Sequence, residues 1–109
     1  MLVDFESLKK HYEGDIEIIA QLVEIFEESY IVSLDQLKIA IAEKDFPSIQ
    51  LHAHTLKGMI GNFFAEDLKN AAYALEKDGR AQNLSEGYEK YLNQLETNIP
   101  SVIEELRKM

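Results

Sequence analysis

DIEIIAQLVEIFEESYIVSLDQLKIAIAEKD, residues 15–45, is the stretch that decides the fold. Its large apolar residues recur at intervals of three or four, which places them in one stripe along a helix. Asp15 can cap the first turn, and the pattern continues to about Lys44. The segment is therefore predicted to be one long amphipathic helix. Its stripe consists of Ile16, Ile19, Val23, Phe26, Tyr30, Leu34, Leu37 and Ile41.

A short helix is expected before this segment and a third helix after it. The first has Asp4 as its N-cap, covers about residues 5–11 and ends near Gly14. The third is capped by Asp45, and Pro47 is tolerated in its first turn. Its apolar face consists of Phe46, Ile49, Ala53, Leu56, Ile60 and Phe63.

Two more helices complete the pattern. The fourth is expected over about residues 65–78, with Gly79 as the residue just past its end. The fifth begins with a plausible capping box at residues 83–86, and Pro100 should kink or briefly break it. The inward residues of these two helices are Leu68, Ala72 and Leu75, then Tyr88, Leu92, Leu95, Ile99, Val102 and Leu106.

Four long amphipathic helices joined by short loops make an antiparallel four-helix bundle, with the short N-terminal helix capping one end. The predicted fold class is all-α, with a single domain over residues 1–109. Neither period-2 alternation nor a hairpin dipeptide indicates a strand. One complete bundle has no obligate need of a second chain, so we expect a monomer.

Composition excludes several classes of function. Twenty acidic against eleven basic residues give a net charge of −9, which opposes binding to nucleic acid and to anionic membrane surfaces. The chain has no apolar run of the ~18–20 residues that a membrane span needs, and it has no signal peptide. Without cysteine it has no disulfide and no thiolate metal site. We expect a cytoplasmic protein whose partner is a protein or a small molecule.

The third helix carries the candidate site. Gln50, Lys57, Gly58 and Gly61 share one helix face with His54, because they lie three, four or seven residues from it. At about 100° per residue, the apolar face is well over a quarter turn away, so His54 is expected to point to solvent. Each interior glycine costs about 0.5–1 kcal/mol relative to alanine. Two glycines beside this histidine indicate that something must come close to the ring.

The residues around His54 suit a nucleophilic histidine. A solvent-facing imidazole is largely neutral at pH 7, and Lys57 can neutralise negative charge on a group that the ring receives. The alternative is an ordinary surface histidine beside a surface lysine, which leaves the two glycines unexplained. Leu51 and Thr55 lie near the same exposed surface and could form part of a docking patch.

Residues 51–62, LHAHTLKGMIGN, closely resemble the signature of histidine-containing phosphotransfer (Hpt) domains, the small four-helix bundles of two-component phosphorelays. The chain departs from the pattern at Phe64, where many members have glycine. A change there is expected to alter packing at the bundle end or the partner surface rather than abolish function. The match covers Ala53, His54, Lys57, Gly58, Gly61 and Asn62, with Ala65, Leu68, Ala72 and Leu75-Glu76 resembling the family's next helix.

The resemblance implies a phosphocarrier. His54 would accept a phosphoryl group on a ring nitrogen, Lys57 would stabilise that group, and Gly58 would give the partner steric clearance. The chain needs no cofactor or metal of its own. It also lacks a nucleotide-binding G-x-x-x-x-G-K-[ST] motif, so no autokinase activity is expected.

The partner implied by the resemblance is the receiver domain of a response regulator, with a hybrid sensor histidine kinase as a second candidate. The receiver's aspartate would exchange the phosphoryl group with His54, and Mg²⁺ would belong to the receiver. The expected docking residues are Gln50, Leu51, Thr55, Gly61 and Asn62.

Other patterns favour simpler interpretations. His52 and His54 point about 200° apart on a helix, so one metal ion cannot bridge them, and His52 is expected to be half-buried. The acidic groups at Glu24, residues 27–28 and residues 104–105 are expected to face solvent. The alternative function is a non-phosphorylated helical interaction module that binds a receiver or another signalling protein. The intact histidine, lysine and glycine favour phosphotransfer over that alternative.

Overall fold

The computed structural model describes residues 1–109 and contains five helices and no strand, which confirms the all-α prediction. None of the helices is both long and apolar enough to cross a bilayer. The helices are α1 (Phe5–His11), α2 (Ile16–Glu43), α3 (Phe46–Gly61), α4 (Glu66–Ala81) and α5 (Tyr88–Arg107).

Three aspartates set the starts of the first three helices, as predicted. The carboxylates of Asp4, Asp15 and Asp45 each accept a hydrogen bond from the backbone N–H three residues further along the chain, at 3.1, 3.1 and 3.3 Å. Each cap satisfies an N–H that the helix leaves unpaired and contributes about 1 kcal/mol.

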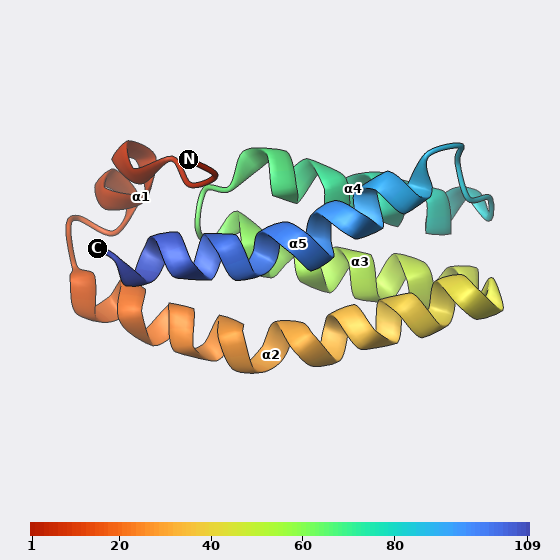
Figure 1. Cartoon of the computed structure of the whole chain (residues 1–109), viewed down its shortest axis with the longest axis horizontal. Helices are drawn as coiled ribbons and strands as arrows, with labels where there is room; N and C mark the ends of the chain where they lie inside the picture. Colours follow the sequence, from red (N-terminus) through yellow and green to blue (C-terminus); the bar gives the residue numbers. More distant parts are fainter.

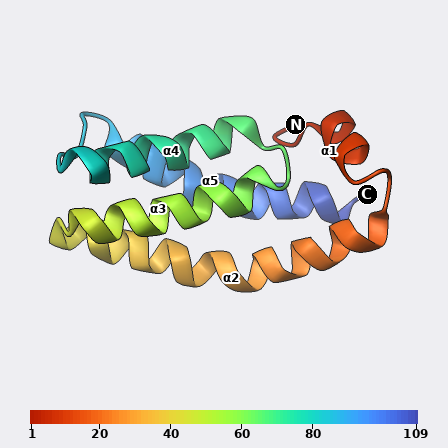
Figure 2. The same cartoon turned by 180° about the vertical axis from the view of Figure 1, so that it is seen from behind.

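The four long helices form an antiparallel bundle, in which each runs opposite to the helix before it (Figures 1 and 2). Helix α2 packs on α3, α3 on α4 and α4 on α5, and α5 returns to α2 to close the bundle. The short α1 lies at the end where α2 begins and α5 ends, next to both termini (Figure 1). This arrangement confirms the predicted four-helix bundle with an extra N-terminal helix.

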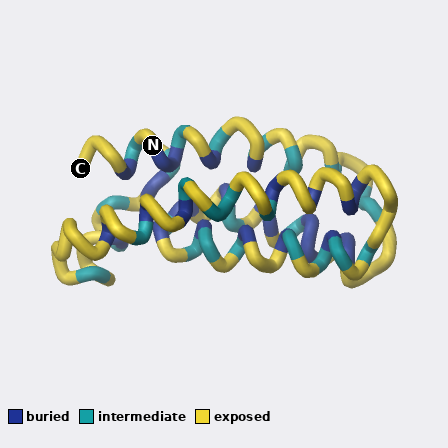
Figure 3. Tube along the Cα trace, turned by 90° about the horizontal axis from the view of Figure 1, so that it is seen from below, coloured by how far each residue is buried: buried dark blue, intermediate teal, exposed yellow.

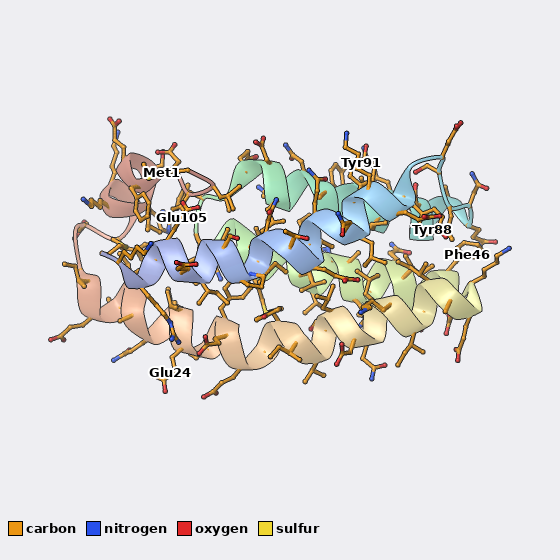
Figure 4. All side chains as sticks on the ribbon, in the orientation of Figure 1. Met1, Glu24, Phe46, Tyr88, Tyr91 and Glu105 are labelled. Carbon is orange, nitrogen blue, oxygen red and sulfur yellow. The ribbon has the colours of Figure 1, made fainter.

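Three of the carboxylates expected to face solvent have partners, among them Glu104, whose Oε1 lies 3.3 Å from Lys108 Nζ. Glu105 accepts hydrogen bonds from the backbone N–H groups of Leu2 at 2.9 Å and Val3 at 3.1 Å. Figure 4 shows Glu105 near Met1, at the end of the bundle where α1 lies. Glu27 pairs with Arg107 across the contact between α2 and α5. The expectation was wrong for Glu105, which is half-buried because α5 ends beside the N-terminal segment. The side chains of Glu27 and Glu104 remain 44% and 70% exposed, as expected.

The core lies between the four long helices, and Figure 3 shows the buried parts of the trace turned inward. Ile16 is the one member of the α2 stripe that is exposed, contrary to the prediction. It is the first residue of α2, and it borders an open hollow that Leu106, Arg107 and Met109 line from the C-terminal end of the chain. Tyr30, Phe46, Tyr88 and Leu92 are half-buried at the border of the core. The buried stripe residues are Ile19, Val23, Phe26, Leu34, Leu37, Ile41, Ile49, Ala53, Leu56, Ile60, Phe63, Leu68, Ala72, Leu75, Leu95, Ile99, Val102 and Leu106.

Helix α4 is longer than predicted, because Gly79 lies inside it rather than just past its end. The helix continues to Ala81, and Gln82 adopts the left-handed conformation of the C-cap, with φ of 55°. Gly79 is buried against α3. A Cβ atom there would lie 2.5 Å from the backbone nitrogen of Gln50 and 2.9 Å from the carbonyl oxygen of Phe46. This glycine therefore serves close helix packing and not helix termination.

The start of α5 also differs from the prediction. The expected capping box does not form, since α5 begins after Gly87, which has a φ of 89° and provides no side-chain cap. Ser85 instead donates hydrogen bonds from its N–H and Oγ to the Asp78 carboxylate, at 3.1 and 2.8 Å. Pro100 does not interrupt α5. It lies on the exposed side, where water can satisfy the carbonyl group that proline leaves without a donor.

We expect Gly79→Ala to destabilise the fold by about 1–3 kcal/mol, because the new methyl group must displace the backbone of α3. Gly58→Ala is the matched control, since a Cβ there has no heavy atom within 4 Å. That control should gain about 0.5–1 kcal/mol from helix propensity. Urea unfolding measures both free energies. Equal effects of the two substitutions would contradict close packing at Gly79.

Candidate functional site

His54 lies on α3 with its side chain 64% exposed, as predicted from the angular separation between His54 and the apolar face. His52 is half-buried, also as predicted, and points to a different side of the helix. No group of three or more potential ligands is placed to hold a metal ion.

The carboxylate beneath His54 belongs to Glu76 of α4, which sequence reasoning did not include in the site. Glu76 Oε2 lies 3.2 Å from His54 Nδ1 and 3.0 Å from a guanidinium nitrogen of Arg80. Glu76 Oε1 lies 2.7 Å from Lys57 Nζ. The Glu76 side chain is only 4% exposed. A buried carboxylate therefore joins three basic side chains from two helices.

A signal for Glu76 was present in the sequence. It lies four residues after Ala72 and directly after Leu75, so it belongs to the inward side of α4. A charged residue at a position that the helical period turns inward is rarely buried unless it is paired. The family resemblance includes Glu76 as part of the next helix. Periodicity alone, however, could not identify the partners of Glu76 on α3.

Opposing effects act on the ionisation of Glu76. Burial raises the pKa of its carboxyl group, whereas hydrogen bonds and positive charge from Lys57 and His54 lower it. The second effect is larger, so the pKa lies below the ordinary value of 4.5. Glu76 is therefore a carboxylate at neutral pH.

The ionised Glu76 decides which nitrogen of His54 carries the proton. A carboxylate oxygen can only accept a hydrogen bond, so Nδ1 must be the donor at this contact. The neutral ring then has its lone pair on Nε2, at the opposite end of the imidazole. The same pairing orients histidines in other nucleophilic and metal sites. In its neutral form, His54 thus presents its lone-pair nitrogen away from the buried carboxylate.

The predicted site face of α3 is only partly open, because it lies along a seam with α4. Lys57 turns toward Glu76, and its side chain is 22% exposed. Gly61 is half-buried, and a Cβ there would make ordinary contact with the Lys69 side chain at 3.7 Å. The expectation that Gly61 lies on the exposed side is therefore wrong. Gly58 is exposed, with open space around it.

The other expected docking residues differ in how accessible they are. Leu51 is a large exposed apolar residue, and Thr55 is exposed but donates its hydroxyl to the Leu51 carbonyl at 3.0 Å. Gln50 is half-buried. Asn62 is exposed just past the end of α3, where its carbonyl oxygen accepts a hydrogen bond from Tyr12 at 2.9 Å. A shallow hollow beside the histidine is lined by Pro47, Gln50, Leu51, His54, Glu76 and Arg80.

Phe64 occupies a backbone conformation that favours glycine. Its φ is 57°, in the left-handed region. Its ring lies 5.4 Å from the ring of His11, and its carbonyl oxygen accepts a hydrogen bond from the Asp4 N–H at 3.0 Å. The Phe64 side chain thus helps to attach α1 to the end of the bundle.

Comparisons with known proteins gave one family model and one solved structure that are similar to this chain. The model of the Hpt domain family matches residues 21–108. The crystal structure of histidine-containing phosphotransfer protein B (HptB) from Pseudomonas aeruginosa PAO1 is similar, with a TM-score of 0.85 at 21% identity. That match covers 98% of this chain and 92% of the HptB chain. At this identity it supports the fold. A search of curated proteins finds no match.

The lowered pKa of Glu76 predicts a pH-dependent contribution to stability. A group whose pKa is lowered on folding stabilises the protein above its ordinary pKa, and this contribution disappears as the pH falls through the lower folded value. Glu76→Gln should therefore cost about 1–3 kcal/mol near neutral pH, and less once the pH falls well below 4.5. Urea unfolding across this range measures the difference.

Glu24→Gln provides the control, because Glu24 is exposed and has no ion-pair partner. It projects away from the bundle in Figure 4. Its effect should be small at every pH. A cost of Glu76→Gln that stays constant from neutral to acidic pH would contradict the ionic role of Glu76.

Proposed function

Because the chain belongs to the Hpt domain family, we propose that it is a phosphocarrier that accepts a phosphoryl group on His54 Nε2. The donor and acceptor would be the aspartate of a response-regulator receiver domain in a two-component phosphorelay. The observation that carries this proposal is the exposed imidazole whose Nδ1 is held by a buried carboxylate, with Lys57 on the same carboxylate.

The transfer step balances without any further reactant. The lone pair of His54 Nε2 attacks the phosphorus of the receiver's aspartyl phosphate, an N–P bond forms, and the aspartate leaves as a carboxylate. The ring keeps its Nδ1 proton and becomes a phosphoimidazolium. The reverse step returns the phosphoryl group to the aspartate, so the same geometry serves both directions.

Glu76 and Lys57 stabilise different parts of the product. The imidazolium gains positive charge during attack, and the Glu76 carboxylate at 3.2 Å stabilises that charge. The phosphoryl group is an anion, and Lys57 is the ammonium group held on the neighbouring oxygen of Glu76. Arg80 can continue to neutralise Glu76 when Lys57 turns toward the phosphoryl oxygens. Preorganised charges of this kind lower the barrier without reorganisation during the reaction.

The chain provides the nucleophile, and the partner would provide the rest of the catalytic apparatus. Mg²⁺ would be bound by the receiver domain, as the family resemblance implies. Gly58 lies one turn from His54 with no side chain and open space around it, so a receiver loop can approach the ring. Leu51, Thr55 and Asn62 are exposed near this approach and would contact the receiver. A hybrid sensor kinase would reach His54 through its own receiver domain.

We expect His54→Gln to abolish phosphoryl acceptance while leaving the melting temperature nearly unchanged, because the side chain is mostly exposed. The measurement is transfer from a panel of phosphorylated receiver domains, with wild type and variant side by side. An acid-labile, base-stable label on wild type alone supports the proposal. Receiver binding without any label would instead favour a non-phosphorylated interaction module.

Gly58→Leu should weaken receiver docking at least about tenfold without unfolding α3, because a bulky side chain would occupy the approach to His54. The apparent affinity for the receiver, taken from the concentration dependence of transfer, measures this. Gly58→Ala is the control for helix propensity and should dock almost normally. Normal docking of the leucine variant would reject the clearance role.

A further inference from the structure

Lys57 is held by two groups of α4, and only one of them is charged. Its Nζ lies 2.7 Å from Glu76 Oε1 and 4.8 Å from the centroid of the Tyr73 ring. Ring faces attract ammonium groups through the negative charge of the π system. The 22% exposure of the Lys57 side chain reflects both contacts. Lys57 is thus less mobile than a lysine on an open helix face.

Tyr73 and Glu76 lie three residues apart on α4 and face α3 together. Tyr73 is partly exposed, and its ring also receives a second ammonium group, Lys77 Nζ, at 4.7 Å from the centroid. The ring therefore has two ammonium groups near it, one from α3 and one from α4. No other tyrosine in the chain has an ammonium group over its ring.

The proposed transfer requires Lys57 to change its anionic partner. Before transfer its ammonium group is bound to Glu76, whereas the phosphoryl group forms on Nε2, at the far end of the imidazole from that carboxylate. The four-carbon stem of a lysine side chain is flexible, so the Lys57 ammonium group can also turn to solvent once it leaves Glu76. A neutral ring beside it restricts that movement without competing for its hydrogen-bond donors.

We propose that Tyr73 is a positioning residue, which keeps Lys57 beside His54 while its ammonium group moves from Glu76 to the phosphoryl oxygens. This inference rests on the proposed function of His54. The ring attracts the ammonium group whichever anion is bound, because that attraction does not depend on Glu76. Tyr73 acts through Lys57 and needs no contact with the phosphoryl group.

The test compares Tyr73→Leu and Tyr73→Phe with wild type in single-turnover transfer from a phosphorylated receiver that labels the wild type. A partly exposed cation–π contact corresponds to a change of about two- to fivefold. We expect Tyr73→Leu to lower the maximal rate by this factor with an unchanged half-saturating receiver concentration. Tyr73→Phe keeps the ring and should react like wild type.

A double-mutant cycle separates this role from a general effect on packing. In a Lys57→Met background, Tyr73→Leu should cause no further loss of rate. Tyr91→Leu is the matched control, since Tyr91 lines the hollow between α4 and α5 with Tyr73 but has no ammonium group over its ring. It should leave the maximal rate unchanged. The same loss from Tyr73→Leu in both Lys57 backgrounds would overturn the inference.

A second measurement does not depend on phosphotransfer. The ε-methylene protons of Lys57 should show an upfield ring-current shift by NMR in wild type and Tyr73→Phe, and lose it in Tyr73→Leu. Identical shifts in all three proteins would overturn the contact itself. A wild type that takes no label would overturn the proposed function, and the positioning role with it, while the NMR result would still report the contact.

Discussion

The close packing of α3 against α4 is the constraint on which the site depends. Gly79 allows the two backbones to approach so closely that a Cβ at this position would overlap Gln50. Because the two helices are antiparallel, residues that face each other then recur every three or four positions. One turn from this contact the register places Glu76 beneath His54, and the next turn places Tyr73 beside Lys57. The site is therefore a row of facing pairs: Gln50 with Gly79, His54 with Glu76, Lys57 with Tyr73, and Gly61 with Lys69.

Glu76 makes this seam chemically useful because it is both buried and ionised. Burial alone would favour the neutral acid, which could donate a hydrogen bond to Nδ1 and hold the imidazole in the wrong tautomer, with its proton on Nε2. Hydrogen bonds and positive charge from Lys57 and His54 reverse that preference and keep the carboxylate an acceptor. The cost of placing a charge in the interior is thus offset by the same side chains that the proposed transfer uses. Stability and function depend here on one set of contacts.

Most of the fold could be predicted from the sequence, because the capping residues and the helical spacing of the apolar residues indicated the same helices. Asp4, Asp15 and Asp45 cap their helices as expected, and the exposure of His54 followed from its angle to the stripe. The errors concern residues whose role depends on a neighbouring helix. Gly79 has the sequence signature of a helix end, and only the distance to α3 shows that it serves packing. The helix face around Gly61 was wrongly expected to be open to solvent. Periodicity predicts which side of a helix faces the core, but it does not show where the adjacent helix lies.

Net charge is a poor guide to the field at this site. The chain carries a net charge of −9, which produces a long-range repulsion of anions. Four of its eleven basic residues nevertheless gather along the seam, namely Lys57, Lys69, Lys77 and Arg80. At contact distance such cations outweigh charges that are more than a Debye length away, about 8 Å at physiological salt. An acidic protein can therefore present a locally cationic surface to a phosphoryl group, and the helix register, more than the composition, determines where that surface lies.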